Sequence, residues 1–386
     1  MLEKFDVVIV GGGMVGAALA IGLAKQNRSV AIIEGHQPQP FQPDQAMDIR
    51  VSAISAASVS LLSELGAWQE ISNMRVCPYR RLETWEHPEC RTRFHSEELK
   101  LSELGFIVEN RLIQLGLWAQ FENHETLTCY CPEKLKSVHF DDSGTNQVEL
   151  ESGRTIEAQW VVGADGANSM VRQIAGIGVT AWDYRHHCML INVETELVQQ
   201  DITWQQFTPF GPRSFLPLCG NQGSLVWYDS PKRIQQLSAM TNEQLREEVL
   251  AEFPKELGDI KVLQHGSFPL TRRHAQQYSK RNCVLVGDAA HTINPLAGQG
   301  VNLGFKDVEA LLKVTSETES LDSELLVEYE RLRRRDNLLM QSGMDFFYKG
   351  FSNNNPVIKP LRNLALKVAE QSGPIKHKVL KYALGL

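Results

Sequence analysis

Three glycine-bearing segments, far apart in the sequence, have the residue types that bind a dinucleotide. Glycine turns let backbone N–H groups approach phosphates, and carboxylates at the ends of parallel strands accept hydrogen bonds from sugar hydroxyls. The segments are Gly11-x-Gly13-x-x-Gly16, Gly163-Ala-Asp165-Gly166 and Gly287-Asp288-Ala-Ala-His291, which continues through Pro295 to Gly298-Gln-Gly300. Their order and spacing together predict one dinucleotide site.

The first segment is the turn of a predicted strand–helix–strand unit. The apolar pattern predicts a strand at 5–10, a helix at 14–26 and a second strand at 30–34. Gly11 permits the tight bend, Gly13 lets a pyrophosphate approach the backbone, and Gly16 lets the helix pack closely on the strand. The pyrophosphate would then meet the positive end of the helix.

Glu34 closes this unit at the end of the second predicted strand. A carboxylate there accepts hydrogen bonds from an adenosine ribose and repels a 2′-phosphate. The pocket is therefore predicted to hold FAD or NAD, and NADP is disfavoured.

The second and third segments each follow a predicted buried strand, at 160–163 and 283–286. Asp288 is interpreted as a ligand of ribityl hydroxyls, whereas Asp165 either shares that role or orders its own turn. After the third segment a helix is predicted from Pro295 to about residue 313. Its start stabilises negative charge on a reduced flavin, and Gly298 and Gly300 let the backbone approach a flat ring.

Taken together, the three motifs resemble those of the single-component FAD-dependent aromatic hydroxylases of the para-hydroxybenzoate hydroxylase type. Segments 50–55 and 108–110 are similar to the ubiquinone-biosynthesis branch of that family. Segments 79–85, 203–209 and 381–386 resemble those of members that act on a polyprenyl methoxy-benzoquinol.

The resemblance implies an enzyme that uses FAD, with NADH or NADPH as reducing co-substrate, to hydroxylate the ring of demethoxyubiquinol. O₂ would react through a flavin hydroperoxide, so no catalytic side chain is required, and His291 is interpreted as structural. The resemblance also implies that Arg50, Asn110 and Gln114 contact FAD. The alternatives are a surface ion pair for Arg50 and helix capping for Asn110 and Gln114.

The implied fold class is α/β: a Rossmann-like FAD-binding domain, a mostly antiparallel substrate sheet and a C-terminal helical tail. The expected boundaries are 1–75, 100–178 and 279–330 for the FAD domain, 76–99 and 179–278 for the substrate domain, and 331–386 for the tail. Several aromatic side chains of the substrate domain either line an apolar substrate cavity or pack in the core. They are Trp204, Phe207, Phe215, Trp227 and Tyr228.

The tail from 356 to 386 is basic in a chain whose net charge is −7. Leu361, Leu364, Ala365 and Val368 recur in it at helical spacing, so this segment either contacts an anionic membrane or packs on the protein's own body. A polyprenyl substrate favours membrane contact. We therefore expect a cytoplasmic protein, peripheral on the inner membrane, with other ubiquinone-biosynthesis enzymes as further partners.

Composition limits the other hypotheses. The acidic net charge argues against nucleic acid as a partner, and the seven cysteines lack zinc spacing, so no metal site is predicted. Two alternatives keep the fold: a flavin-dependent reductase or dehydrogenase of an isoprenoid lipid, and a non-catalytic prenyl-binding protein. Oxygen consumption coupled to product formation would exclude the first alternative, and bound flavin would argue against the second.

Overall fold

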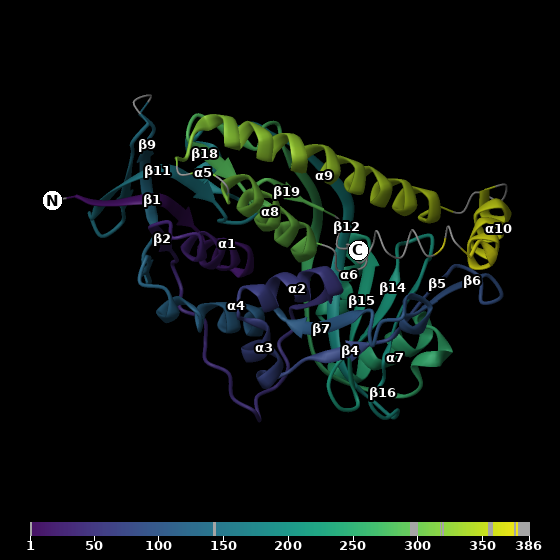
Figure 1. Cartoon of the computed structure of the whole chain (residues 1–386). Helices are drawn as coiled ribbons and strands as arrows, with labels where there is room; N and C mark the ends of the chain where they lie inside the picture. Colours follow the sequence, from purple (N-terminus) through teal and green to yellow (C-terminus); the bar gives the residue numbers. More distant parts are fainter. Residues whose placement is uncertain are drawn as a thin grey trace.

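The computed structural model describes residues 2–141, 144–293, 300–316, 318, 320–353, 358–373 and 376. Their strands form three sheets, with the first sheet at one end of the molecule and the second at the other (Figure 1). Two larger hydrophobic cores correspond to this division. One surrounds the first sheet, and the other lies between the second sheet and the helices at 231–238 and 242–252.

The first sheet has the order β17-β18-β11-β1-β2-β8, and β10 and β9 extend it beside β11. The pairs β18–β11, β11–β1, β1–β2 and β2–β8 are parallel. The bounds are β1 (Glu3–Val10), β2 (Val30–Ile33), β8 (Leu127–Tyr130), β9 (Leu135–His139), β10 (Asn146–Leu150), β11 (Thr155–Gly163), β17 (Ser279–Lys280) and β18 (Cys283–Leu285). Both faces of its central strands are covered, which explains their uninterrupted apolar sequences.

The second sheet has the order β19-β16-β12-β15-β14-β13-β5-β6 and is antiparallel except for the parallel pair β13–β5. Its bounds are β5 (Arg81–Trp85), β6 (Arg91–His95), β12 (Val179–Thr195), β13 (Ile202–Gln206), β14 (Arg213–Pro217), β15 (Gln222–Asp229), β16 (Ile260–Ala275) and β19 (His291–Thr292). Strand β5 therefore lies beside a strand more than 100 residues later in the sequence.

A small antiparallel sheet, in the order β3-β7-β4, completes the strands: β3 (Val51–Ser55), β4 (Cys77–Tyr79) and β7 (Gly105–Glu109). The helices are α1 (Met14–Lys25), α2 (Ala56–Glu64), α3 (Trp68–Met74), α4 (Asn110–Trp118), α5 (Met170–Ile174), α6 (Pro231–Ser238), α7 (Asn242–Glu252), α8 (Gly300–Thr315), α9 (Ser323–Phe351) and α10 (Ile358–Gln371).

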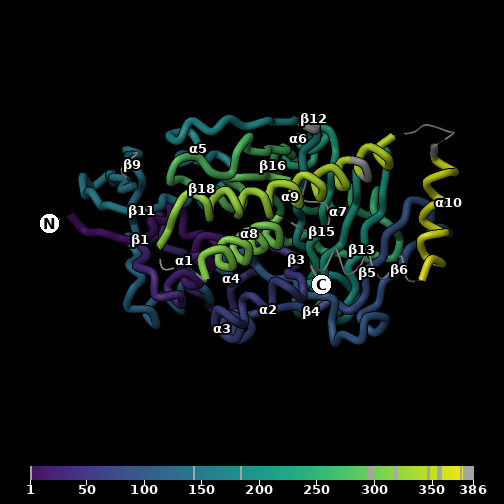
Figure 2. Tube along the Cα trace, turned by 45° about the horizontal axis from the view of Figure 1, so that its top comes forward, coloured from purple at the N-terminus to yellow at the C-terminus, as the bar shows by residue number. Residues whose placement is uncertain are grey.

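The first predicted unit is confirmed as β1, α1 and β2, each within two residues of its expected bounds. Thr241 is the N-cap of α7, and it accepts a hydrogen bond from the Gln244 backbone in a reciprocal capping box. Helix α9 lies beside α8 and extends from the first sheet to the second, where α10 follows it (Figure 2).

Candidate functional site

The first glycine turn is shaped by close backbone contacts. Gly11 has a φ of +104°, and a Cβ there would lie 2.4 Å from the Ala164 carbonyl oxygen. A Cβ on Gly16 would lie 2.0 Å from the Gly11 oxygen, so the helix start packs directly on the turn. Around Gly13, by contrast, no atom lies within 4 Å of such a Cβ. This open cradle at the N-terminus of α1 fits a phosphate.

Side chains from two other elements hold the same turn. Glu34 accepts hydrogen bonds from the backbone N–H groups of Gly12 (2.7 Å) and His36 (3.0 Å). The Gly12 carbonyl accepts from Gln114 Nε2 and Trp118 Nε1, both at 2.8 Å. Gln114 therefore contacts the turn that would bind the phosphates. Trp118 was missed, although it follows Gln114 by one helical turn on the same face of α4.

A single cavity of about 870 Å³ connects the cofactor motifs to the second sheet. Gly13, Asp288 and Gly300 line one part of it, and apolar side chains such as Leu190, Leu216 and Val226 line the other. A volume of this size suits a small-molecule site. The part with the open glycine turn and a carboxylate fits FAD, and the apolar part could hold an aromatic ring.

The two motif aspartates lie in different surroundings. The Asp288 side chain is exposed to the cavity although it lies deep in the protein; this burial raises its pKa above the ordinary value, while His291 and Arg50 oppose the rise. Asp165 accepts hydrogen bonds from the backbone of Met170 (2.6 Å) and Val171 (3.1 Å), at the start of α5. Asp165 thus orders its own turn, and its predicted contact with FAD gains no support from this geometry.

Arg50 and Asn110 both line the cavity. The Arg50 guanidinium lies 4.4 Å from the centroid of the Phe268 ring and forms no ion pair with any described residue, so the surface ion pair is not observed. The Asn110 side chain accepts a hydrogen bond from Ser52 Oγ at 2.7 Å, which ties α4 to β3. Arg50 is therefore available to an anionic group in the cavity.

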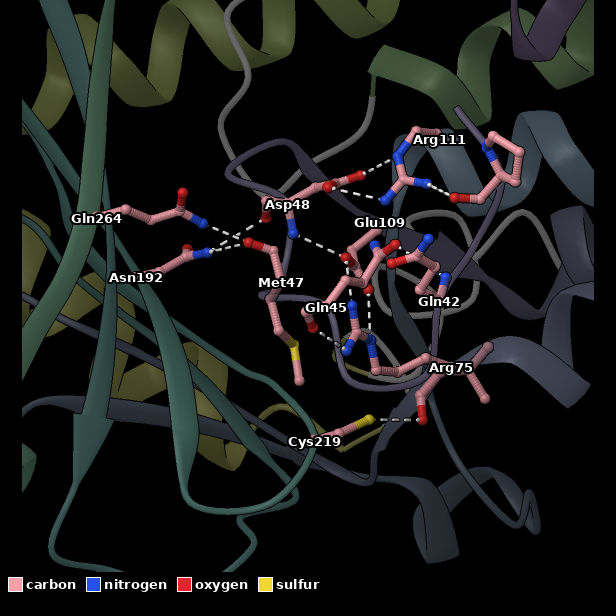
Figure 3. Close-up of polar contacts among 12 residues, drawn as sticks. Gln42, Gln45, Met47, Asp48, Arg75, Glu109, Arg111, Asn192, Cys219 and Gln264 are labelled. Atoms are coloured by element: carbon pink, nitrogen blue, oxygen red, sulfur yellow. Dashed lines mark hydrogen bonds and ion pairs between the residues drawn. The ribbon is translucent and has the colours of Figure 1, made fainter. Parts of the chain in front are cut away.

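Hydrogen bonds from two sides hold Met47 and Asp48, which precede Arg50 in the sequence (Figure 3). From the cofactor side, Arg111 binds the Asp48 carboxylate through two nitrogens at 2.9 and 3.0 Å, and Glu109 accepts from the Asp48 N–H at 2.7 Å. From the second sheet, Asn192 and Gln264 both donate to the Met47 carbonyl. Spacing in the sequence did not predict these contacts, because their partners lie 60 to more than 200 residues apart.

The third motif is described in part. Pro295 and Gly298 lie outside the described residues, whereas Gly300 begins α8 and lines the cavity. The buried side chain of Asn302 accepts from the Ser55 N–H (3.1 Å) and donates to the Ala53 carbonyl (2.8 Å). These bonds hold the start of α8 against β3, with its N-terminal dipole directed at the cavity.

Alternation along the strands separates the predicted aromatic residues. On β15, Val226 and Tyr228 line the cavity, whereas Trp227 points to the opposite face and belongs to the core. Phe215 is in the same core. Phe207 stacks on Phe351, with 4.3 Å between the two ring centroids. Trp204 also contributes to the cavity wall. Core packing is therefore the observed role of Phe207, Phe215 and Trp227.

Comparison with known proteins agrees with this geometry. Residues 4–339 match the family described as "FAD binding domain". The chain is 53% identical to the 3-demethoxyubiquinol 3-hydroxylase of Escherichia coli, over 100% of this chain and 99% of that one. It is 34% identical to the ubiquinone hydroxylase UbiL of Rhodospirillum rubrum, over 98% and 89% of the two chains.

Among solved structures, p-nitrophenol 4-monooxygenase PnpA of Pseudomonas putida superimposes with a TM-score of 0.80 over 99% of each chain, at 19% identity. This similarity confirms the predicted fold class, and the family match confirms FAD as the cofactor. The chain belongs to the FAD binding domain family, and within it to the flavoprotein aromatic monooxygenases.

Proposed function

We propose that this protein hydroxylates the ring of demethoxyubiquinol, a polyprenyl methoxy-benzoquinol, with O₂ and NADH or NADPH as co-substrates. The observation that carries the proposal is the full-length 53% identity to a 3-demethoxyubiquinol 3-hydroxylase. The cavity supports it, because one continuous space joins the cofactor motifs to an apolar wall.

The residues of the chain would bind, orient and shield, while bound FAD supplies the oxygen-transfer chemistry. Gly13 and the start of α1 would hold the pyrophosphate, Glu34 a ribose and Asp288 the ribityl hydroxyls. Leu190, Val226 and their neighbours would hold the quinol ring and keep water out of the cavity. The N-terminus of α8 would stabilise negative charge on the reduced flavin.

A mass-spectrometric profile of quinone lipids from cells lacking this protein tests the proposal. Accumulation of demethoxyubiquinone with loss of ubiquinone is expected, and the mass gives the prenyl length. Accumulation of an earlier ring intermediate would assign the enzyme to another hydroxylation. A normal profile, in a strain without a redundant enzyme, would contradict the proposal.

We also propose that α10 contacts an anionic membrane surface. Its side chains Leu361, Leu364 and Val368 are 62%, 57% and 56% exposed, and they form a stripe along the helix. Lys359 and Lys367 are exposed near this stripe. Among the described residues, no helix is long and apolar enough to cross a membrane.

The opposite face of α10 packs on the protein, which agrees with the second of the two interpretations of the tail. Arg362 is buried and forms an ion pair with the buried Glu86, and Lys376 pairs with Glu98 and Glu370. These two cations hold the tail against the substrate domain, so fewer charges are available to lipid than the sequence suggested. The apolar stripe therefore has to contribute most of the contact.

Sedimentation with vesicles tests this contact. The full chain should bind vesicles that contain anionic lipid, and the double variant Leu361→Asp/Leu364→Asp should bind about tenfold more weakly or worse, because it loses two apolar contacts. Leu339→Asp is the matched control, since Leu339 is 66% exposed on α9. Equal binding of the double variant and the full chain would refute the role of α10.

A further inference from the structure

One carboxylate oxygen of Asp307 holds both ends of the turn that carries Asp288. Asp307 Oδ2 accepts a hydrogen bond from the Gly287 backbone N–H at 3.0 Å, and His291 Nε2 lies 2.5 Å from the same oxygen. Gly287 has a φ of +58°, a left-handed conformation that favours glycine. The five-residue turn is therefore closed by a side chain from α8.

The other oxygen of Asp307 connects the turn to α9. Oδ1 accepts from Arg333 Nε at 2.8 Å and from Asn337 Nδ2 at 3.2 Å. Burial alone would raise the pKa of Asp307, but His291 and Arg333 outweigh it and hold the pKa at about 2. The carboxylate is thus ionised, fully buried and satisfied by four donors.

This arrangement leaves Asp288 as the polar side chain of the turn that is exposed to the cavity. The neighbouring Ala289 and Ala290 are buried, and His291 points inward, where its ring lies 5.9 Å from that of Tyr278. The backbone of a turn closed at both ends cannot move Asp288 away from the cavity without breaking bonds to a buried charge, which is costly.

We propose that Asp307 and His291 are positioning residues that fix Asp288 in the direction in which it binds FAD. Neither residue is among the described residues that line the cavity, and both act through the backbone of the turn. The inference rests on the proposed contact between Asp288 and the ribityl chain. It also gives the histidine of the third motif a role that requires no proton transfer to substrate.

A double-mutant cycle on FAD affinity tests the proposal. The dissociation constant is measured by flavin fluorescence on the full chain after FAD removal. His291→Phe keeps a ring beside Tyr278 but loses the bond to Asp307, and it should weaken FAD binding about tenfold, as expected for one charge-assisted hydrogen bond. In an Asp288→Ala background the same change should weaken binding less than about threefold, because the group being positioned is absent.

Asp307→Asn should weaken FAD binding as His291→Phe does, but it also removes the negative charge that pairs with the buried Arg333. If Asp307→Asn does not fold for this reason, His291→Phe still tests the proposal. Asp336→Asn is the control: Asp336 binds Arg333 Nη1 at 2.7 Å, and none of the hydrogen bonds of residues 287–291 in the described part of the chain involves it, so FAD affinity should not change. Equal fold-changes in both backgrounds would overturn positioning through Asp288. If Asp288→Ala alone left FAD affinity unchanged, the ribityl contact itself would be wrong, whatever the result for His291.

Discussion

Gly13 and Gly16 lie three residues apart in one turn, yet alanine should have different effects at the two positions. At Gly16 a Cβ would meet the Gly11 oxygen at 2.0 Å and the Ala164 Cβ at 3.0 Å. Backbone has to shift to relieve this overlap, at a cost of about 1–3 kcal/mol or more. Gly16→Ala should therefore destabilise the protein even without FAD.

At Gly13 the backbone has φ −68° and ψ −174°, which alanine adopts freely, and no atom lies within 4 Å of the new Cβ. Gly13→Ala should change the free energy of unfolding by less than about 1 kcal/mol, because the reduced freedom of the unfolded chain is offset by the weaker preference of alanine for the N-cap position of α1. Its methyl group would project into the cavity where a pyrophosphate is proposed to bind. Loss of one hydrogen bond to a charged group, about 1.5–3 kcal/mol, predicts FAD binding roughly 10- to 140-fold weaker.

Urea unfolding of the FAD-free protein and fluorescence titration with FAD separate the two effects. Gly343→Ala in α9 serves as the control, because a Cβ there also meets no atom within 4 Å and the site lies outside the cavity lining. The argument fails if Gly13→Ala retains full FAD affinity. It also fails if Gly13→Ala destabilises the FAD-free protein as much as Gly16→Ala does.

Two further substitutions have outcomes set by the structure. Burial, aided by His291, lowers the pKa of His274 from 6.5 to about 4, so the unfolded chain binds the proton first. Stability present above pH 6.5 is therefore lost as the pH falls towards 4, by at most about 3 kcal/mol and by less where solvent screens the charge. His274→Phe should flatten this loss in urea midpoints measured between pH 7 and 5, and an unchanged slope would contradict the assignment. Trp118→Phe removes the N–H group that donates to the Gly12 carbonyl. Loss of this hydrogen bond, about 1 kcal/mol, should weaken FAD binding about fivefold. Unchanged affinity in the fluorescence titration would show that this bond does not support the turn.

The geometry of the proposed cofactor half was predictable because its determinants are local in sequence. A left-handed turn at Gly11, a close helix at Gly16 and a carboxylate at Glu34 are each set within one strand–helix–strand unit. Glycine and carboxylate requirements of this kind follow from backbone geometry, so residue type and spacing suffice. The structure places all three at the predicted turn.

The buried side chains that hold the turns and the tail in place were not predictable from the sequence. Asp307 contacts Gly287 from 20 residues away and Arg333 from 26. Its spacing from Leu303 and Leu311 puts it on the buried face of α8, but that spacing does not identify its partners. Arg362 belongs to the basic tail, yet it is buried against a partner, Glu86, that lies 276 residues earlier. Pairings of this range depend on how helices pack on sheets, which sequence spacing does not encode.

The substrate half raises a different difficulty, because its chemistry depends on which alternate side chains of a strand face the cofactor. Ser214 and Leu216 line the cavity, whereas Phe215 between them is in the core, and a one-residue shift in the pairing of β14 would exchange these roles. The backbone motifs for FAD tolerate no such exchange, but the cavity wall is made of side chains that can change without altering the turn. Substrate choice in this fold should therefore reside in the second sheet, and flavin binding in the glycine turns and their buried supports.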